Sequence, residues 1–412
     1  MNNLQNKLLN FIIYVLPIFI ILGNLYVNLF YFFLIIFFIL NFKMFKYYDF
    51  LNNFILFFFI YILIVNVINL NFVYWENAFL YVLYVILTLI FIYGIKSKII
   101  KLEKILFFYL IIFTIVLFDT YFQYFTSKNI LGYEIEPNNK IRLTSFFKDK
   151  YVVGSFLAKL SIPLITFVYL KSKQYKILLS LTFSFLTFIA IFLSGERAAF
   201  IIFFVGIMLT FIFISKLRNL IYIYLLIASI LVPVLLIYNQ NIHKRFIDET
   251  IKDTFSISSS KRILDNHYGA IFLASLELIK EKPFFGHGTK GYRRNVCDPD
   301  KFLIIQNKIK NNTNHHKFIC STHPHNNILE YLIDYGVMGL IFYLIYLCYF
   351  LIRVIEIRKL DPICTAFGVQ FLANSFFFIT QGSHFASWNF IFLLLNFSFF
   401  NALYVLKKNQ YI

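Results

Sequence analysis

The stretch from Ser321 to Gly339, STHPHNNILEYLIDYGVMG, places polar side chains where the chain passes from a polar segment into a long apolar one. Imidazole, amide and carboxylate groups are costly to place at the edge of a hydrocarbon region, and they are commonly functional there. We therefore expect the chemistry of this protein to lie in this stretch. Its candidate side chains are His323, His325, Asn326, Asn327, Glu330 and Asp334.

The residue types favour group transfer from a phosphorylated donor. A histidine with a pKa near 6.5 suits removal of a proton from an attacking hydroxyl, which makes His325 the candidate base. Arginine binds phosphate through two parallel hydrogen bonds and stays charged. Two arginines, Arg197 and Arg262, therefore suit a pyrophosphate leaving group whose charge grows in the transition state. Together these residues indicate glycosyl transfer from a lipid pyrophosphate.

Other chemistries fit the pattern less well. The segment HHKFICSTHPH holds four histidines and Cys320, but their spacing matches no common zinc finger, and we expect no metal. Glu330 and Asp334 stand four residues apart on one helix face, so they cannot flank a glycosidic bond. They suit orienting a histidine, stabilising an arginine or meeting polar neighbours. The G-x-S-x-G elbow of Ser-His-Asp hydrolases is absent from the sequence.

The composition is that of a multi-pass membrane protein. Hydrophobic residues make up 60% of the 412 residues, charged residues only 14%, and the mean hydropathy is +0.74. A bilayer needs about 20 apolar residues per helix, and no small-residue cleavage site follows the first apolar run, so we expect it to be retained. The predicted spans are 8–23, 26–42, 50–72, 77–94, 104–125, 151–170, 176–194, 197–215, 219–239, 326–352, 362–380 and 387–406.

The basic residues of the short loops predict the orientation. Loops that follow even-numbered spans carry Lys or Arg, whereas the loops at 24–25, 71–77 and 381–386 carry none. Both termini are then cytoplasmic, and residues 240–325 lie on the opposite, outer side of the membrane. We predict helices over 1–239, a periplasmic loop subdomain over 240–325 and helices over 326–412, in a bacterial inner membrane with the active site facing the periplasm.

The long outer loop has a net charge of +6, from fourteen basic and eight acidic residues. This charge favours an anionic lipid or substrate over nucleic acid, and we expect Arg293 to contribute to substrate binding. An amphipathic helix that starts near Arg262 and stops at Pro283 is predicted to lie across the membrane surface. Cys297 and Cys320 share this outer segment, where a disulfide between them is expected.

Cations also occur in the shorter outer segments. Arg142 precedes the sixth span, and Lys159 falls about two turns inside it. Lys159 either extends to the outer headgroups or faces a cavity that holds an anionic substrate. The turn LSGERAAF places Glu196 and Arg197 at the outer interface. Either the two residues form a pair in which Glu196 caps a helix start, or Arg197 is functional. We expect Arg142, Lys159, His323 and Asn326 to assist substrate binding.

These motifs resemble the O-antigen ligase and O-antigen polymerase superfamily of bacterial envelope glycan transferases. The ligase signature is His, then Asn, Ser or Gln, nine residues and G-x-x-G; it is matched here by His325-Asn326 and Gly336 to Gly339. SGERAAF resembles the family's outer turn with a functional arginine, at Arg197. KRILDNHYGAIFLASLELIKEKPFFGHG resembles the segment with the second arginine, at Arg262, without the family's usual tryptophan. RLTSFFKDKYVVGSFL resembles its Arg-to-Gly stretch.

The resemblance implies an all-α polytopic, GT-C-like fold of about twelve spans and a reaction without a metal or other cofactor. It implies an undecaprenyl-pyrophosphate-linked glycan as donor, His325 as base and both arginines on the pyrophosphate. A ligase joins a finished glycan to a lipid A core, whereas a polymerase joins lipid-linked repeats. We expect a ligase because the signature is complete. The alternatives are a polymerase and, from a different class, a transporter or flippase for the same lipid-linked glycan, although no inverted repeat is found.

Overall fold

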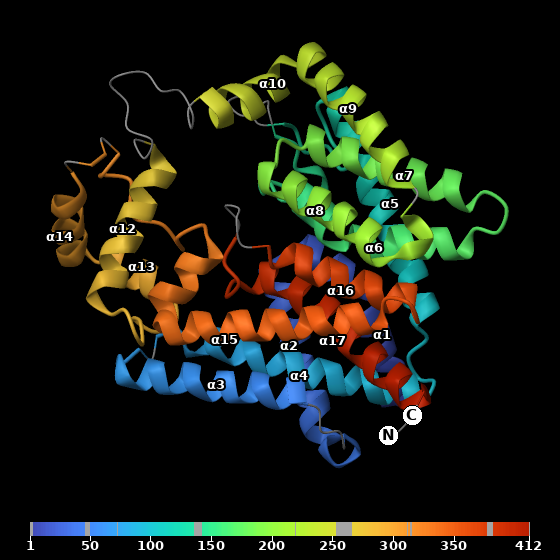
Figure 1. Cartoon of the computed structure of the whole chain (residues 1–412), viewed down its shortest axis with the longest axis horizontal. Helices are drawn as coiled ribbons and strands as arrows, with labels where there is room; N and C mark the ends of the chain where they lie inside the picture. Colours follow the sequence, from blue (N-terminus) through green and yellow to red (C-terminus); the bar gives the residue numbers. More distant parts are fainter. Residues whose placement is uncertain are drawn as a thin grey trace.

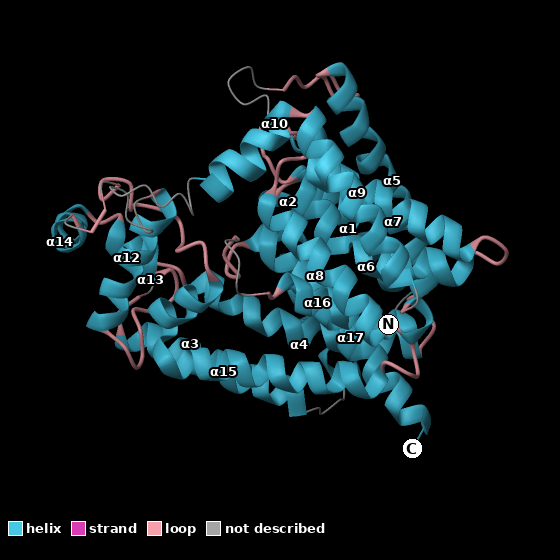
Figure 2. Cartoon of the chain, turned by 45° about the horizontal axis from the view of Figure 1, so that its top comes forward, coloured by secondary structure: helices cyan, strands magenta, loops and turns pink. Residues whose placement is uncertain are grey.

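The computed structural model describes residues 3–45, 50–71, 73–135, 142–218, 220–252, 266–310, 312–313, 315–376 and 382–411. Helices are the dominant regular elements of these residues, together with an isolated bridge between Lys128 and Glu134 (Figure 2). The long helices are α1 (Asn3–Leu22), α2 (Asn24–Leu40), α3 (Phe50–Ile68), α4 (Trp75–Lys96), α5 (Leu102–Thr126), α6 (Val153–Lys171), α7 (Lys176–Leu193), α8 (Arg197–Phe213), α9 (Leu220–Tyr238), α15 (Asn327–Ile357), α16 (Pro362–Asn374) and α17 (Ser387–Tyr411).

A helix lies at each of the twelve predicted windows, which confirms a polytopic, all-helical membrane protein. Among the described residues, nine helices are long and apolar enough to cross a bilayer, and α2 and α8 are shorter, with 17 residues each. The helix α16 has 13 residues and ends at Asn374, before the predicted end at 380. Residues 377–380 of that window lie outside the described part of the chain.

The contacts between helix ends agree with the predicted alternation of the spans. At one end, Trp388 Nε1 donates to the Ile20 carbonyl over 2.9 Å, and Asn77 Nδ2 donates to the Phe385 carbonyl over 2.8 Å. At the other end, Lys171 pairs with Glu103 at 2.8 Å. Both chain termini lie at the end of the bundle away from α12 and α14 (Figure 1). Segments predicted to share a side of the membrane are therefore brought together.

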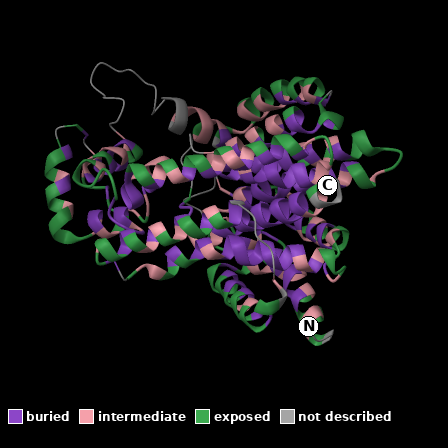
Figure 3. Ribbon diagram, turned by 60° about the horizontal axis from the view of Figure 1, so that its bottom comes forward, coloured by how far each residue is buried: buried purple, intermediate pink, exposed green. Residues whose placement is uncertain are grey.

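The core of the bundle is apolar and aromatic. The most buried stretch includes α6 and α17, whose spans are 83% and 94% buried, against 17% for α9. α17 packs against α4, α2 and α16, and α6 packs against α5, α7, α8 and α16. Buried residues accordingly gather in the middle of the bundle (Figure 3). Polar side chains that lie on α6 and α17 are thus held by protein and not by lipid.

The outer loop forms a small helical subdomain beside α15 (Figure 1). This subdomain contains α12 (His267–Glu281), α13 (Gly291–Val296) and α14 (Pro299–Ile309). The first part of the outer loop, α10 (Gln240–His243) and the π-helix η5 (Lys244–Lys252), instead follows α9, against which α10 packs. The subdomain's own core buries Ile271, Leu278, Tyr292 and Ile305. The apolar side of α12 therefore packs on protein, which differs from the predicted position across the membrane surface.

Candidate active site

The backbone turns sharply at His325, directly before α15. Its φ angle is +57°, in the left-handed region that non-glycine residues seldom occupy. Such conformations persist only where the surroundings hold them, and they are frequent at functional sites. The side chain is half-buried, and Nε2 lies 3.1 Å from Ser321 Oγ. The fold thus presents this imidazole at a fixed position outside the helix.

Aromatic rings surround His325. Tyr268 of α12 meets it edge to face with ring centroids 5.6 Å apart, and the His323 ring is 4.2 Å away. Burial, together with charge repulsion from His323 and His267, lowers the pKa of His325 to about 4. The imidazole is therefore neutral at pH 7. A neutral ring can accept a proton, as a general base must.

The next two residues fix the start of α15. Asn326 is its N-cap, with the side-chain oxygen accepting from Leu329 N over 3.1 Å. The sequence predicted a substrate contact for Asn326, and the structure shows a helix-capping contact. Asn327 is 1% exposed, and its amide nitrogen lies 2.7 Å from His384 Nε2. His384 was missed from sequence, because only packing brings residue 384 to residue 327.

The turn between α7 and α8 is bound to the start of α6. Gly195 has a φ of +70° and reverses the chain. The Glu196 carboxylate accepts from Gly154 N at 2.7 Å, from Ser155 N at 3.2 Å and from Ser155 Oγ at 2.7 Å. Glu196 therefore caps α6, and not α8, whose first turn it precedes. Its pKa is raised by burial, while the bond from Ser155 and the charge of Arg142 lower it.

Gly154, in the first turn of α6, has a steric reason to be glycine. A Cβ added at Gly154 would lie 2.3 Å from Ser194 Oγ and 3.1 Å from Glu196 Oε1. Only glycine lets the turn approach the α6 N-terminus this closely. The two motifs around Arg142 and Arg197, about 50 residues apart in sequence, are therefore parts of one contact.

Arg142 links this turn to the surroundings of His325. Its Nη2 donates to the Tyr151 carbonyl over 3.0 Å, and its guanidinium lies 4.6 Å from the centre of the Tyr151 ring. Burial lowers the pKa of Arg142, Glu196 opposes that shift, and Tyr268 also interacts with its charge. Tyr268, whose ring contacts His325, is therefore within electrostatic range of Arg142.

A further arginine joins this group. Arg245 of η5 donates from Nε to the Gly195 carbonyl over 3.4 Å, and its charge is felt by Arg142. The neighbouring Phe246 stacks on Phe192 with centroids 4.5 Å apart, which holds η5 against the turn. In the sequence, Arg245 is one of the basic residues that give the outer loop its positive net charge, and no site role was predicted for it. Arg197 itself is half-buried at the first position of α8.

The other cations predicted to belong to the site lie away from the turn at Gly195 or outside the described part of the chain. Arg262 is among residues 253–265, which lie outside the described part. Arg293 is exposed on α13. Lys159 is only 4% exposed and donates to Asn389, between the rings of Trp388 and Phe392 at 5.8 and 5.5 Å. Lys159 therefore does not extend to the outer headgroups.

The two carboxylates of α15 serve different partners. Asp334 accepts from the backbone nitrogens of Lys290 and Gly291, both at 2.9 Å, and so caps α13. Glu330 accepts from Ser383 Oγ and, over 3.1 Å, from His384 N. Both carboxylates thus meet polar neighbours, the third of the roles considered from sequence.

Gly336 marks a break inside α15. Its φ is +67°, and a Cβ there would lie 2.1 Å from the Phe284 carbonyl oxygen. The segment after α12 inserts at this break, with Val337 N donating to Pro283 O over 2.8 Å and His287 N donating to Ile333 O over 2.7 Å. The close neighbour of this glycine is thus the backbone of a loop and not another helix.

The outer subdomain is also closed covalently. Cys297 and Cys320 form a disulfide, as predicted, with Cα atoms 4.8 Å apart. Cys320 is thus not available as a thiolate ligand. Within the described residues, no three His, Cys, Asp or Glu side chains are grouped as a metal site.

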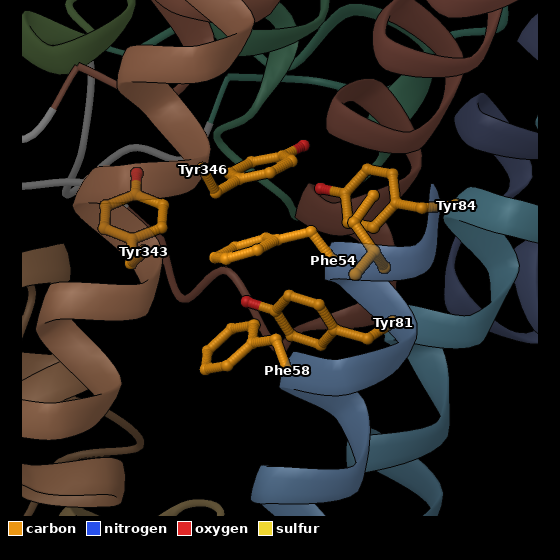
Figure 4. Close-up of a pocket in the computed structure, with 7 residues that line it drawn as sticks. Phe54, Phe58, Tyr81, Tyr84, Tyr343 and Tyr346 are labelled. Carbon is orange, nitrogen blue, oxygen red and sulfur yellow. The ribbon is translucent and has the colours of Figure 1, made fainter. Parts of the chain in front are cut away.

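Two cavities lie away from His325. Rings of α3, α4 and α15 surround a cavity of about 10 Å³ (Figure 4), at the lower limit for one water molecule. A larger cavity of about 1040 Å³ lies between α1, α5 and α6, and Glu103, Lys104 and Lys171 line it. These residues are at the end predicted to face the cytoplasm. Neither cavity contains a predicted site residue.

The comparisons with known proteins bear on the same segment. Residues 182–344 match the family model described as O-antigen ligase. No curated protein matches the chain. The matched segment runs from α7 into α15, and it includes the turn at Gly195, η5, α12 and the His325 motif. The match over residues 182–344 therefore supports the resemblance of this segment to the O-antigen ligase and O-antigen polymerase superfamily.

Proposed function

We propose that this protein transfers a glycan from undecaprenyl pyrophosphate to an acceptor hydroxyl at the periplasmic face of the inner membrane. In this reaction the acceptor oxygen attacks the anomeric carbon, and the bond from that carbon to the pyrophosphate oxygen breaks. His325 takes the proton of the hydroxyl, and the pyrophosphate leaves with the bonding electrons. The observation that carries the proposal is the imidazole of His325, held at a left-handed turn of the backbone in ring contact with Tyr268, which interacts electrostatically with Arg142.

The state of His325 suits the base. Its pKa is lowered to about 4 by burial, so the ring holds no proton at pH 7 and is ready to accept one. Among the described residues, Ser321 is the hydrogen-bond partner of Nε2, and no partner is seen for Nδ1. One ring nitrogen is thus available to the acceptor hydroxyl.

The cations suit the leaving group. Arg142, Arg197 and Arg245 gather at one turn, and the excess positive charge there complements a pyrophosphate. Arg197 and Arg262 are assigned to the pyrophosphate, with Arg142 and Arg245 as further contacts. Fixed guanidinium groups stabilise charge that develops as the glycosyl bond breaks. Lys159, His323, Asn326 and Arg293 remain predicted supports of substrate binding.

A ligase is the favoured member of the superfamily, because the sequence carries the complete signature from His325 to Gly339. Its acceptor would be a lipid A core or a similar hydroxyl. The alternative is a polymerase that joins lipid-linked repeats. A lipid-linked glycan transporter is the alternative from another class, and it would move the glycan without breaking the pyrophosphate bond.

Deletion of the gene separates these functions when lipopolysaccharide is examined on a gel. Loss of all long chains, with polymer accumulating on the lipid carrier, indicates a ligase. A core that carries a single repeat indicates a polymerase. In addition, purified protein supplied with donor and acceptor should release undecaprenyl pyrophosphate. Movement of the donor across vesicles without such release would reject both transferase functions.

A further inference from the structure

A buried polar network lies below the proposed site, at the outer ends of α6, α15 and α17. Its side chains are each at most 6% exposed, although they carry charges or strong hydrogen-bonding groups. Burial of such groups is unfavourable unless each is bonded. The members are Lys159, Asn327, Glu330, Ser383, His384 and Asn389.

The network joins two opposite charges through the segment that precedes α17. Lys159 Nζ donates to Asn389 Oδ1, and Asn389 Nδ2 donates to the Gly382 and Ser383 carbonyls at 2.9 and 3.0 Å. Ser383 Oγ and His384 N then donate to Glu330. Residues 382–386 are therefore bound both to α6 through Lys159 and to α15 through Glu330.

The imidazole of His384 completes the link to the proposed base. The amide nitrogen of Asn327 can only donate, so Nε2 of His384 is the acceptor across 2.7 Å. Burial lowers the pKa of His384 to about 3, and the charge of Lys159 adds to this shift. The ring is neutral, with its proton on Nδ1. Asn327 is two residues beyond His325.

The hydrogen bond between Asn327 and His384 lies close to the strained backbone at His325 and can help to hold it. A left-handed φ at a non-glycine residue costs on the order of 1–3 kcal/mol and is kept only by fixed neighbours. Asn326 holds one side of the turn by capping α15. Asn327 holds the first turn of that helix against His384. Elsewhere in the same bundle, Asn396 bonds only to backbone carbonyls, at 2.7 and 3.3 Å.

We propose that His384 is a positioning residue, which holds His325 in place for proton transfer by accepting the Asn327 amide. Lys159 and Glu330 anchor His384 from the two sides of the bundle. This inference rests on the proposed function, since His325 is the base in that reaction. It gives Lys159 and Glu330 a role without contact to the substrate.

Paired substitutions at Asn327 test the link. In Asn327→Leu the hydrogen bond is lost, and we expect kcat to fall about 100-fold, as for a misplaced catalytic group, with little change in the donor KM. In Asn327→Asp the bond can be kept, because His384 can move its proton to Nε2 and donate to the carboxylate. We expect kcat within about fivefold of the unsubstituted protein for this variant. His384→Ala should behave like Asn327→Leu.

Asn396→Leu is the matched control, since it also removes a fully buried amide, whose bonds go to the Phe392 and Lys159 carbonyls and not to the Lys159 side chain or to His384. It should lower the thermal unfolding temperature while kcat stays within about threefold. An equal loss of kcat in Asn396→Leu and Asn327→Leu would overturn the proposal. If Asn327→Leu does not fold, Ser383→Ala replaces it, because this change removes the bond to Glu330 and leaves Asn327 intact.

A second measurement does not depend on turnover. Diethyl pyrocarbonate modifies unprotonated histidine, and mass spectrometry of the peptide resolves His325 from its neighbours. Release of the turn should make His325 react several-fold faster in Asn327→Leu and His384→Ala, but not in Asn396→Leu. An unchanged rate would reject the positioning role. Absence of transfer by the unsubstituted protein would instead reject the proposed function, and the reactivity result would still stand.

Discussion

The two sides of the proposed site respond differently to the same physical effect. Around the turn at Gly195, burial lowers the pKa of Arg142, yet a guanidinium starts so far above neutral pH that it stays charged. At the head of α15, burial lowers the pKa of His325 to about 4, and the imidazole becomes neutral. Desolvation, the largest cause of both shifts, thus leaves a cationic side for a leaving group and a neutral side for a base.

This comparison predicts the largest loss at the neutral side. We expect His325→Ala to lower kcat by about 10²–10⁴-fold, the usual contribution of a general base. Binding of the donor should change little, because the cations are intact. Initial rates with purified protein and a lipid-pyrophosphate donor give the first quantity, and donor titration gives the second. Near-normal transfer by this variant would remove His325 from the reaction.

At the cationic side, Arg197→Ala should cost about 10²–10³-fold in kcat/KM, as for a donor that stabilises developing charge. Arg197→Lys should recover only part of the loss, because lysine lacks the planar pair of donors. Arg218→Ala serves as the control, since Arg218 follows α8 at its other end. Equal effects of Arg197→Ala and Arg218→Ala would contradict a role on the pyrophosphate.

The pH profile distinguishes a buried base from an ordinary one. With a lowered pKa, His325 gains its inactivating proton only as pH falls towards about 4, so kcat/KM should stay level from pH 8 to about 5.5. A histidine with an unshifted pKa of about 6.5 would lose roughly tenfold at pH 5.5. His323→Asn removes the nearest charge repulsion and should move the acid limb upward. An acid limb near 6.5 in the unsubstituted protein would contradict the burial argument.

The smallest expected effect concerns the support of α15. Gly336→Ala should destabilise the protein by about 1–3 kcal/mol, because the added Cβ meets the Phe284 backbone. Gly132→Ala is the matched control: Gly132 also has a positive φ, of +85°, but open space around its Cβ position. Thermal unfolding in detergent measures both. Similar shifts would show that the φ angle alone, and not the inserted loop, accounts for the cost.

Much of the fold follows from local sequence properties. The apolar runs predicted a helix at every window, because a backbone in hydrocarbon must satisfy its hydrogen bonds within the helix. Pro283 ends the region of α12 as expected, since proline cannot continue a helix. The pairing of Cys297 with Cys320 followed from their shared outer segment. His325 was recognised from the spacing of its motif.

Long-range partners could not be predicted in this way. Glu196 was expected near a helix start, but its partner is α6, whose first turn precedes it by about 40 residues. In the sequence, Arg245 was one basic residue among fourteen, and only the packing of η5 on the turn at Gly195 distinguishes it. Gly336 belongs to the signature after His325, but its spacing does not reveal that the loop at Phe284 packs against it.

The sequence by itself determined the membrane-spanning class, the alternation of the helices and the choice of His325 as the candidate base, because hydropathy and short motifs are local. Only the tertiary structure decided which side chains surround that base. Tyr268 meets His325 from α12, and His384 meets Asn327 from the segment before α17. Each of these pairs joins elements more than 50 residues apart, and such contacts arise from how buried polar groups satisfy one another when the helices pack.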